Sequence, residues 1–364
     1  MGEIKDRWLS KEQKVDILAI TAEAVEKSIS VTRTCVFLRI SRRRVVRWRW
    51  KEKNEQSLEN IKPGPKEPIH RLLPVEREAV LQMAAKEEYA DLSHRILTVT
   101  AWDTGVFFMS FSSVYRILRS ANLMTMRGIN KQHNGRSIPP VRKELTGPNQ
   151  RWCWDISYLT THEKAVFLYL YLLLDEYSRK AISWLISWHQ TAQKARYLLE
   201  DGLISENILD LPDDQRPEVI NDRGRQMKAK PIKRMFEDHH MPQMFARPRT
   251  PNDNPFVESL FGTIKRAPQY PGRFLDRQEA VEYFNRYFPW YNKEHLHSGI
   301  DFVTPEQCHQ GLRESIVAQR KEKLKKQRHF RKEVNLLYQN TLTNNPVNLI
   351  VNPNQIFPCS VMIS

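Results

Sequence analysis

The stretch RWCWDISYLTTHEKAVFLYLYLLL, residues 151–174, decides the fold. Its first part, 151–159, is aromatic and β-branched with an alternating polar face, whereas 165–174 is an almost unbroken apolar run. The first pattern predicts a half-buried strand and the second predicts a strand buried on both faces. Residues 181–189 predict a third strand, so the main domain should begin with three consecutive strands.

Alternating helices and strands are expected after these three strands. The expected segments are a helix, a strand, a helix, a strand and two helices, over 191–207, 218–220, 231–240, 244–246, 255–266 and 277–291. Gly202 should interrupt the end of the first of these helices. The order predicts an α/β domain in which a mixed five-stranded sheet is flanked by helices.

Upstream of residue 148 the sequence is helical and basic. Ser10 and Gln13 form a capping-box pattern that opens a helix, and Ser41 is placed to cap an arginine-rich helix after a tight turn. Two helices joined by a tight turn, the second basic, are typical of a helix-turn-helix that contacts DNA. The alternative is a solvated basic helix face. The candidate DNA contacts here are Arg42, Arg43, Arg44, Arg47 and Arg49.

A second helix-turn-helix-like unit is expected over 73–124, with helices at 93–104 and 112–120. Apolar residues in the second helix also fit plain packing, so DNA contact is one of two interpretations. Its candidate DNA contacts are Ser112, Ser113, Tyr115 and Arg116. Further on, residues 313–332 hold nine basic and two acidic residues. This charge favours contact with the DNA backbone over a merely solvated helix.

Proline-rich or polar, basic segments separate these units and predict linkers. The expected division is a helix-turn-helix domain, a linker, a second helix-turn-helix-like domain, a linker, an α/β core and a basic C-terminal extension, over 1–60, 61–72, 73–124, 125–147, 148–311 and 312–364. Residues 341–364 contain short strand-like pieces that predict a small β unit.

Composition narrows the class of protein. The 364 residues carry 57 Lys and Arg against 42 Asp and Glu, a formal net charge of +15. A surplus of positive charge of this size most often indicates a polyanionic partner, and nucleic acid is the leading candidate. The apolar run 165–174 is well short of the roughly 20 residues that a membrane span needs. Four scattered cysteines form no CxxC pair, which argues against a zinc ribbon or a disulfide framework. We expect a cytoplasmic protein without a membrane partner.

Three acids mark the candidate site. Asp155 lies mid-strand, Asp222 follows a short strand, and Glu258 lies near the start of a helix, with 35 residues between the last two. Carboxylates without a cysteine or histidine set favour hard cations, Mg²⁺ or Mn²⁺. Two such ions can serve an in-line displacement at phosphorus. Lys265, seven residues after Glu258, should project from the same helix face and contact DNA, with Arg266 as a second candidate and a plain surface lysine as the alternative.

Other polar groups near these acids are expected to have structural roles. Asn254 should shape the loop before the last acid rather than bind metal. Asp175 and Arg179 should form an ion pair on the turn between the second and third strands. His295 and His297 should either pack or touch the DNA backbone.

The motifs around the three acids resemble a known family. They are PNQRWCWDISYL (148–159), LLLDEYSRKAISW (172–184), VINDRGRQM (219–227), RPRTPNDNPFVESLFGTIKR (247–266) and YNKEHLHSGIDFVTPEQ (291–307). They are similar to DDE transposases of bacterial insertion sequences, whose core resembles that of retroviral integrases. The resemblance implies an RNase H-like fold, with Asp155, Asp222 and Glu258 as the catalytic residues and metal ligands. It also implies that the upstream helix-turn-helix segments bind element ends.

The function implied is metal-dependent cleavage of the element's end, followed by attack of the freed 3′-hydroxyl on a target phosphodiester. The resemblance implies two Mg²⁺ or Mn²⁺ ions and no nucleotide cofactor. The implied partners are double-stranded DNA, both terminal repeats and target, and at least one further copy of the chain. The implied location is the bacterial nucleoid.

Two alternatives differ in class: a catalytically silent, sequence-specific DNA-binding regulator and an RNase H-like nuclease. The intact set of acids argues against the regulator. The paired DNA-binding units argue against a nuclease without choice of site.

Overall fold

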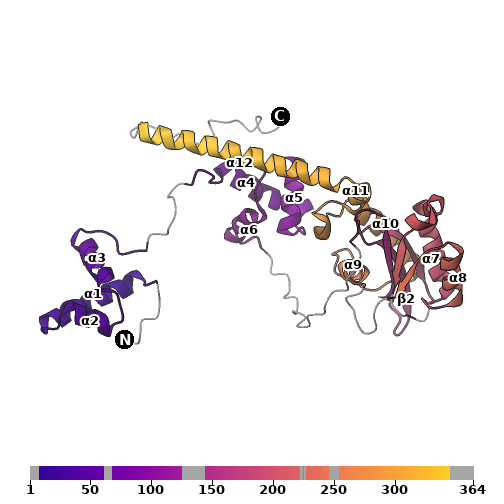
Figure 1. Cartoon of the computed structure of the whole chain (residues 1–364), viewed down its shortest axis with the longest axis horizontal. Helices are drawn as coiled ribbons and strands as arrows, with labels where there is room; N and C mark the ends of the chain where they lie inside the picture. Colours follow the sequence, from indigo (N-terminus) through magenta and orange to yellow (C-terminus); the bar gives the residue numbers. More distant parts are fainter. Residues whose placement is uncertain are drawn as a thin grey trace. The chain divides into compact units, whose positions relative to one another are not determined.

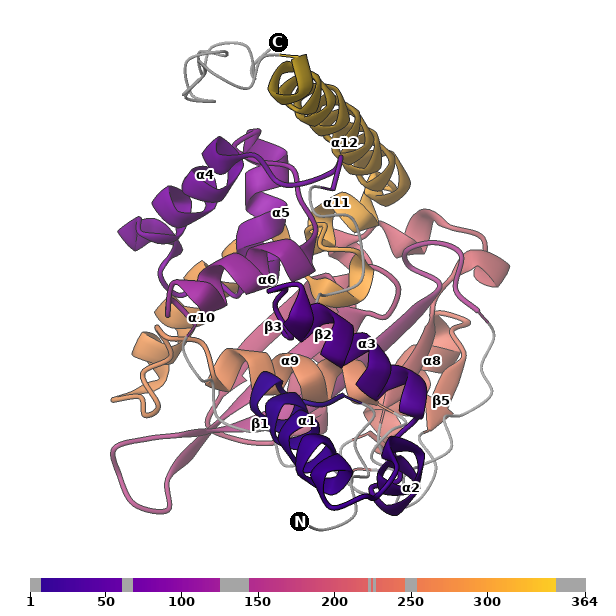
Figure 2. The ribbon, with the colours of Figure 1, turned by 90° about the vertical axis from the view of Figure 1, so that its left-hand side faces the viewer.

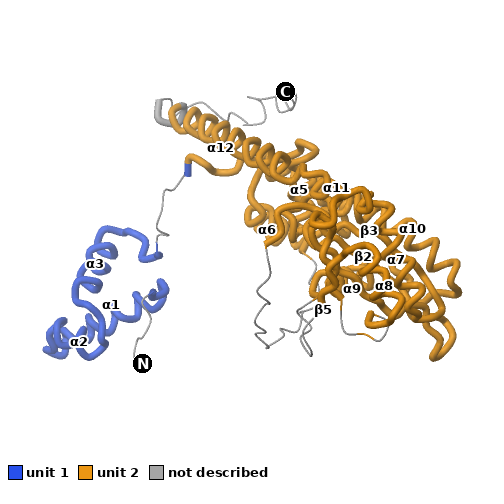
Figure 3. Tube along the Cα trace, turned by 45° about the vertical axis from the view of Figure 1, so that its right-hand side comes forward, with its two compact units in different colours: residues 1–68 blue, residues 69–364 orange. Residues whose placement is uncertain are grey.

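The computed structural model describes residues 8–60, 68–124, 144–221, 224, 227–245 and 254–344, with only the backbone over 341–344. Asp222 and the strand-like pieces expected after residue 344 lie outside these residues. The chain divides into two compact units, Met1–Pro68 and Ile69–Ser364 (Figure 3). The finer domain boundaries expected from the sequence stay a prediction.

Three helices build the described part of the first unit: α1 (Lys11–Glu26), α2 (Val31–Phe37) and α3 (Arg42–Lys53). Ser10 caps α1 and forms the expected capping box with Gln13. The turn between α2 and α3 passes through Arg39, whose backbone is left-handed with φ 54°. Ile17, Val45 and other apolar side chains form a small shared core. The helical character expected of this region is confirmed.

The second unit begins with another group of helices, α4 (Pro74–Ala84), α5 (His94–Thr104) and α6 (Phe111–Ser120). Ser93 caps α5, and Gly105 ends it in the left-handed region with φ 77°. Ser110 caps α6, so this helix begins one residue earlier than expected. Val80, Leu97 and Val114 belong to the core that the three helices share.

A mixed five-stranded sheet forms the centre of the second unit. Its strands are β1 (Arg151–Thr160), β2 (Phe167–Asp175), β3 (Ala181–Ser187), β4 (Glu218–Asn221) and β5 (Gln243–Phe245), in the order β3-β2-β1-β4-β5. The first three strands are antiparallel neighbours, β4 is parallel to β1, and β5 is parallel to β4. This arrangement confirms the expected RNase H-like fold.

Helices cover both faces of the sheet (Figures 1 and 2). On one face lie α7 (Ala192–Ser205) and α8 (Lys230–Asp238), and on the other lie α9 (Pro255–Lys265) and α10 (Arg277–Lys293). Alternate residues of β2 serve the two cores: Leu170 and Leu172 face α9 and α10, whereas Tyr171 and Leu173 face α7. The strand is therefore buried on both faces, as predicted.

The helix α7 passes close to the sheet at Gly202. A Cβ added to this glycine would lie 2.4 Å from Cδ2 of Leu173. The prediction that Gly202 interrupts the helix is wrong, because α7 continues through it to Ser205. The glycine permits close packing instead.

After α10 the chain passes α11 (Pro305–His309) and enters α12 (Arg313–Asn344), a helix of 32 residues. Figure 1 shows α12 lying alongside α4 and α5. Two buried arginines join these helices. Arg320 binds the Asp103 carboxylate at 2.8 and 2.6 Å, and Nε of Arg331 lies 2.8 and 2.7 Å from the Glu76 oxygens. Part of the basic segment thus binds the chain's own acids. No helix in the described ranges, α12 included, is long and apolar enough to cross a membrane.

Candidate active site

Asp155 lies in the middle of β1, half-buried, after the buried Trp154. One of its carboxylate oxygens accepts a hydrogen bond from the Ile156 N–H at 2.8 Å. Across the sheet its partner on β2 is the buried Leu172. A carboxylate in such an apolar strand is costly unless other groups stabilise its charge, which makes Asp155 a functional candidate on structural grounds.

Glu258 is exposed on the first turn of α9, where the helix dipole favours a negative charge. Asn254 precedes this turn, and its buried side-chain amide donates a hydrogen bond of 3.3 Å to the Trp154 carbonyl. That carbonyl belongs to the residue immediately before Asp155. Asn254 therefore joins the start of α9 to the middle of β1, in agreement with its expected structural role.

The third expected acid follows β4 directly in the sequence. β4 ends at Asn221, which is fully buried, and Asp222 lies outside the described residues. Asp155 and Glu258 supply the oxygen ligands that Mg²⁺ prefers. Within the ranges that the structure covers, no three His, Cys, Asp or Glu side chains lie together so as to hold a metal ion. The donor chemistry of the three expected carboxylates fits a hard divalent cation.

Lys265 and Arg266 lie at the end of α9, and both are exposed. Neighbouring atoms partly desolvate the Lys265 ammonium and lower its pKa. The Arg266 side chain folds back over Gly262, where an added Cβ would meet the guanidinium at 3.2 Å. Contact of either residue with DNA stays a prediction.

No ion pair joins Asp175 and Arg179 in the described structure, so this expectation is wrong. Asp175 is fully buried and accepts hydrogen bonds from Asn149 N–H and from the N–H and hydroxyl of Ser178. Burial raises the pKa of Asp175, although these hydrogen bonds oppose the change. Arg179 has a left-handed backbone, φ 64°, and its guanidinium carbon lies 3.5 Å from the centroid of the Phe256 ring in the first turn of α9.

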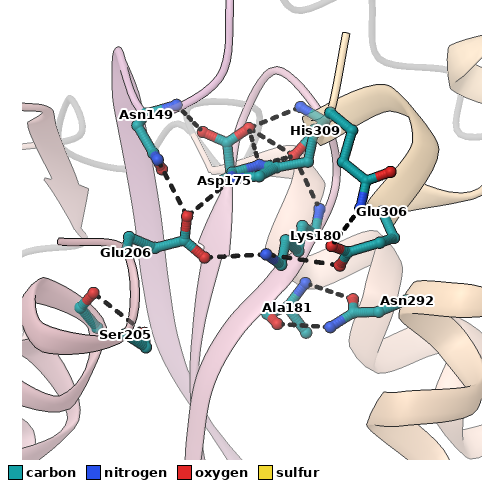
Figure 4. Close-up of polar contacts among 12 residues, drawn as sticks. Asn149, Asp175, Lys180, Ala181, Ser205, Glu206, Asn292, Glu306 and His309 are labelled. Carbon is teal, nitrogen blue, oxygen red and sulfur yellow. Dashed lines mark hydrogen bonds and ion pairs between the residues drawn. The ribbon is translucent and has the colours of Figure 1, made fainter. Parts of the chain in front are cut away.

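A largely buried polar cluster surrounds Asp175 and Glu206 (Figure 4). At its centre Glu206, the C-cap of α7, receives hydrogen bonds from His309 Nε2 at 2.7 Å and from the side chains of Asn149 and Lys180 at 3.0 Å. Burial alone would raise the pKa of Glu206, but these partners together lower it to about 2. Nδ1 of His309 lies 3.0 Å from the hydroxyl of Ser178. The cluster therefore ties α11 to α7 and to the β2–β3 turn.

Sequence reasoning missed this cluster because its members are distant along the chain. Glu206 and His309 are 103 positions apart, and neither stands in a motif that predicts a pairing. The same holds for Asn292, whose side-chain amide binds both the N–H and the carbonyl of Ala181 at 2.9 and 2.8 Å.

His295 and His297 pack within the protein. The His295 ring stacks on Tyr291 with ring centroids 5.3 Å apart and planes 20° from parallel. Burial lowers the pKa of both histidines to about 4. Both are therefore neutral at pH 7, which favours the packing interpretation over contact with phosphate.

The arginines expected to contact DNA from α3 differ in exposure. Arg42, Arg43 and Arg47 are exposed, whereas Arg44 and Arg49 are half-buried. The Arg44 guanidinium carbon lies 5.1 Å from the Trp48 ring centroid. At least one of the five candidate arginines, Arg44, therefore packs on a neighbouring ring of its own helix.

The candidate contacts on α6 lie largely on its solvent side. Ser112, Tyr115 and Arg116 are exposed and Ser113 is half-buried, while the apolar residues between them are buried. Arg116 donates a hydrogen bond of 3.2 Å to the Ser112 carbonyl. The Tyr115 ring contacts the His94 ring of α5, with centroids 5.4 Å apart. Contact of this face with DNA stays a prediction.

Family models and related proteins agree with the fold. Two models described as integrase core domain match residues 146–251 and 240–305. The transposase of insertion sequence element IS904 from Lactococcus lactis is 28% identical over 168 residues, 45% of this chain and 62% of that protein. Transposase InsF of insertion sequence IS3A from Escherichia coli is 31% identical over 166 residues, 44% of this chain and 54% of that protein. The chain thus spans only part of the curated relatives that it matches.

Solved structures of viral integrases are also similar. The HTLV-2 integrase catalytic core domain in complex with magnesium is 15% identical, with a TM-score of 0.33, covering 45% of this chain and 97% of that chain. A simian T-cell lymphotropic virus intasome with a PP2A regulatory subunit is 16% identical, with a TM-score of 0.37, covering 62% and 74%.

Residues 146–305 thus match models of the integrase core domain. The chain is similar to transposases of bacterial insertion sequences over much of this region, and the resemblance expected from the sequence is confirmed.

Proposed function

We propose that the chain is a DDE polynucleotidyl transferase that cuts DNA at the ends of an insertion element and joins the freed 3′ end to target DNA. The observation that carries the proposal is the placement of Asp155 and Glu258 on two packed elements of an integrase core. The hydrogen bond from Asn254 to Trp154 fixes the start of α9 against β1 beside these acids.

The strand register supports Asp222 as the third acid. Arg151, Trp152 and Cys153 of β1 each pair with the β4 residue that lies 67 positions further along the chain. Asp155 and Asp222 are also 67 positions apart. If the parallel pairing of β1 and β4 runs on by two residues, the two aspartates become neighbours.

The three carboxylates would hold Mg²⁺ or Mn²⁺, two ions in the full site, and these supply positive charge at the reacting phosphate. The protein's own part is positioning, because the chemistry needs no side-chain nucleophile. In the first step an oxygen of water bonds to phosphorus and the 3′-oxygen of the element end leaves. In the second, that 3′-oxygen bonds to a target phosphorus and displaces a 3′-oxygen of the target strand.

Binding of element ends is assigned to the helical segments. The exposed Arg42, Arg43 and Arg47 on α3 and the exposed side of α6 offer the contacts, with Lys265 and Arg266 closer to the reacting phosphate. Because two element ends must be held together, we expect at least a dimer on DNA. Because the proposed substrate is DNA, we expect the protein at the bacterial nucleoid.

The test compares wild type with Glu258→Gln on a labelled duplex that carries the element's terminal repeat. Gln keeps the shape of the side chain and removes its charge. We expect wild type to nick and join the end in Mg²⁺ or Mn²⁺, and the variant to bind the duplex while losing at least 100-fold in cleavage rate, since such active-site charges contribute several kcal/mol. Chelation of divalent ions by EDTA should abolish cleavage by wild type.

Glu237→Gln, on the exposed side of α8, serves as the control and should cut like wild type. If wild type and Glu258→Gln both bind the element end and neither cuts it with any metal, the protein is a regulator. Cutting without joining and without preference for the terminal repeat would indicate a nuclease. Equal cutting by Glu258→Gln and wild type would remove Glu258 from the site.

A further inference from the structure

The basic residues of α12 differ in burial and in their partners. Arg320 and Arg331 are buried and bind Asp103 and Glu76 in the α4–α6 group. Six others form no ion pair with any other residue that the structure describes: Lys321, Lys323, Lys325, Lys326 and Arg328 are exposed, and Lys332 is half-buried. Four of them, Lys321, Lys325, Arg328 and Lys332, are here called the basic stripe.

The spacing of the basic stripe places its four charges on one side of the helix. Steps of four, three and four residues keep the side chains within about 60° of one another around the axis. This direction is about 100° away from that of Arg320 and Arg331. The stripe therefore stays accessible when α12 lies against α4 and α5.

No ion pair joins an acid of α12 to the stripe among the described residues. Glu322, three residues before Lys325, pairs with none of the four, and Glu333 pairs with His329 at 3.2 Å. Like charges four residues apart, as in Lys321 and Lys325 or Arg328 and Lys332, destabilise a helix by a few tenths of a kcal/mol. A row of this kind is favourable when a polyanion covers it.

The dimensions and composition of the stripe fit duplex DNA. From Lys321 to Lys332 it is about 16 Å long, which corresponds to roughly five base pairs. Single-stranded nucleic acid would call for aromatic side chains on which bases stack, and none stands in the stripe. Phe330, the aromatic residue within the same span, lies half-buried on another side of the helix.

We propose that the basic stripe of α12 binds the sugar–phosphate backbone of duplex DNA independently of sequence. This inference rests on the proposed function, in which the chain acts on DNA. The contacts of Arg320 and Arg331 fix the stripe relative to the α4–α6 group. DNA held there therefore takes a defined direction past the helices that precede the core.

The experiment uses the full chain with Lys321, Lys325, Arg328 and Lys332 changed to Gln. Gln is a good helix former, three of the four sites are exposed and the fourth is half-buried, so α12 should persist. The control changes Lys194, Lys230, Lys233 and Arg234 to Gln, the same residue types at exposed positions on α7 and α8. Fluorescence anisotropy measures the binding of a terminal-repeat duplex and an unrelated duplex over a series of NaCl concentrations, without divalent ions. Circular dichroism checks the helix content of both variants.

We expect the stripe variant to bind both duplexes about 10- to 100-fold more weakly at low salt. The slope of log affinity against log salt should fall by about 3 to 4, close to one unit for each lost phosphate contact. The control should keep most of the wild-type slope. Because no cleavage is measured, a wild type that binds but does not cut would contradict the proposed function and leave this inference standing.

Three outcomes would overturn the inference. The first is a slope for the stripe variant that equals the slope of the control. The second is a loss of affinity confined to the terminal-repeat duplex, because backbone contacts carry no sequence preference. The third is an unchanged affinity for DNA together with the loss of a dimer in light scattering, which would assign the stripe to a second copy of the chain.

Discussion

A single buried amide sets the start of α9. The side-chain oxygen of Asn254 has no hydrogen-bond partner among the described residues, whereas its nitrogen binds the Trp154 carbonyl. An unsatisfied buried oxygen costs roughly 1–3 kcal/mol, so its presence beside the candidate site needs an explanation. An ion or water between α9 and β1 would satisfy it.

Glu206 shows how a residue outside the site controls stability. Its pKa lies near 2 in the folded protein and near 4.3 in an unfolded chain. A lowered folded-state pKa contributes stability that is complete above the unfolded value and is lost as the pH falls towards the folded value. Glu206→Gln should therefore be less stable than wild type at pH 7, by roughly 3 kcal/mol.

The same variant should lose less stability than wild type between about pH 5 and pH 2.5. Urea midpoints across this range measure the difference, with the exposed Glu237→Gln as control. The raised pKa of Asp175 acts in the opposite direction in wild type and in the variant alike. Parallel pH profiles for wild type and Glu206→Gln would contradict the assignment.

At the scale of elements, the packing of α7 against the sheet depends on the absence of a side chain at Gly202. Ala is favoured over Gly inside a helix by about 1 kcal/mol. At Gly202, however, the added Cβ would overlap the buried Leu173, and overpacking costs about 1–3 kcal/mol. Gly202→Ala should therefore lower the free energy of unfolding despite the better helix propensity.

Gly262→Ala gives the matched comparison, because the atoms near its added Cβ belong to the exposed Arg266 side chain, which can move. That variant should be neutral or stabilised. Thermal unfolding of both variants, and of Gly202→Ala combined with Leu173→Val, measures the contrast. Equal Tm gains at the two glycines would mean that α7 is free to shift away from the sheet.

These elements were predictable where the signal is local. The apolar run of β2 and the caps Ser10 and Ser93 determine structure within a few residues, and the strand and helices appeared where expected. Asp155 and Glu258 stood out because strand and helix context made them unusual. The turn of Arg179 onto Phe256 was not predictable, because it depends on a left-handed backbone and a ring 77 positions away.

At the scale of the whole molecule, the link between Arg331 and Glu76 joins the end of the second unit to its beginning. Removing the arginine leaves a buried carboxylate short of its cationic partner, a change that typically costs 3–5 kcal/mol. Gln327 and the Leu73 N–H still bind Glu76, so for Arg331→Ala we expect about 3 kcal/mol, the lower end.

Hydrogen exchange locates this loss. Amides of α4 and of α12 near Arg331 should exchange faster in Arg331→Ala, and adding Glu76→Gln should restore part of the protection because the buried charge is then gone. Lys326→Ala, at an exposed position of the same helix, should exchange like wild type. Equal exchange rates over α4 in wild type, Arg331→Ala and the double variant would show that α12 does not stabilise the α4–α6 group.

The contact between Arg331 and Glu76 also has a consequence for the order of synthesis. Glu76 is made 255 residues before Arg331. During translation the α4–α6 group and the whole sheet emerge before the helix that fastens them together. A chain that stops short of residue 331 keeps every acid of the candidate site and lacks this fastening. Synthesis of residue 331 therefore sets the earliest moment at which α12 can fasten α4.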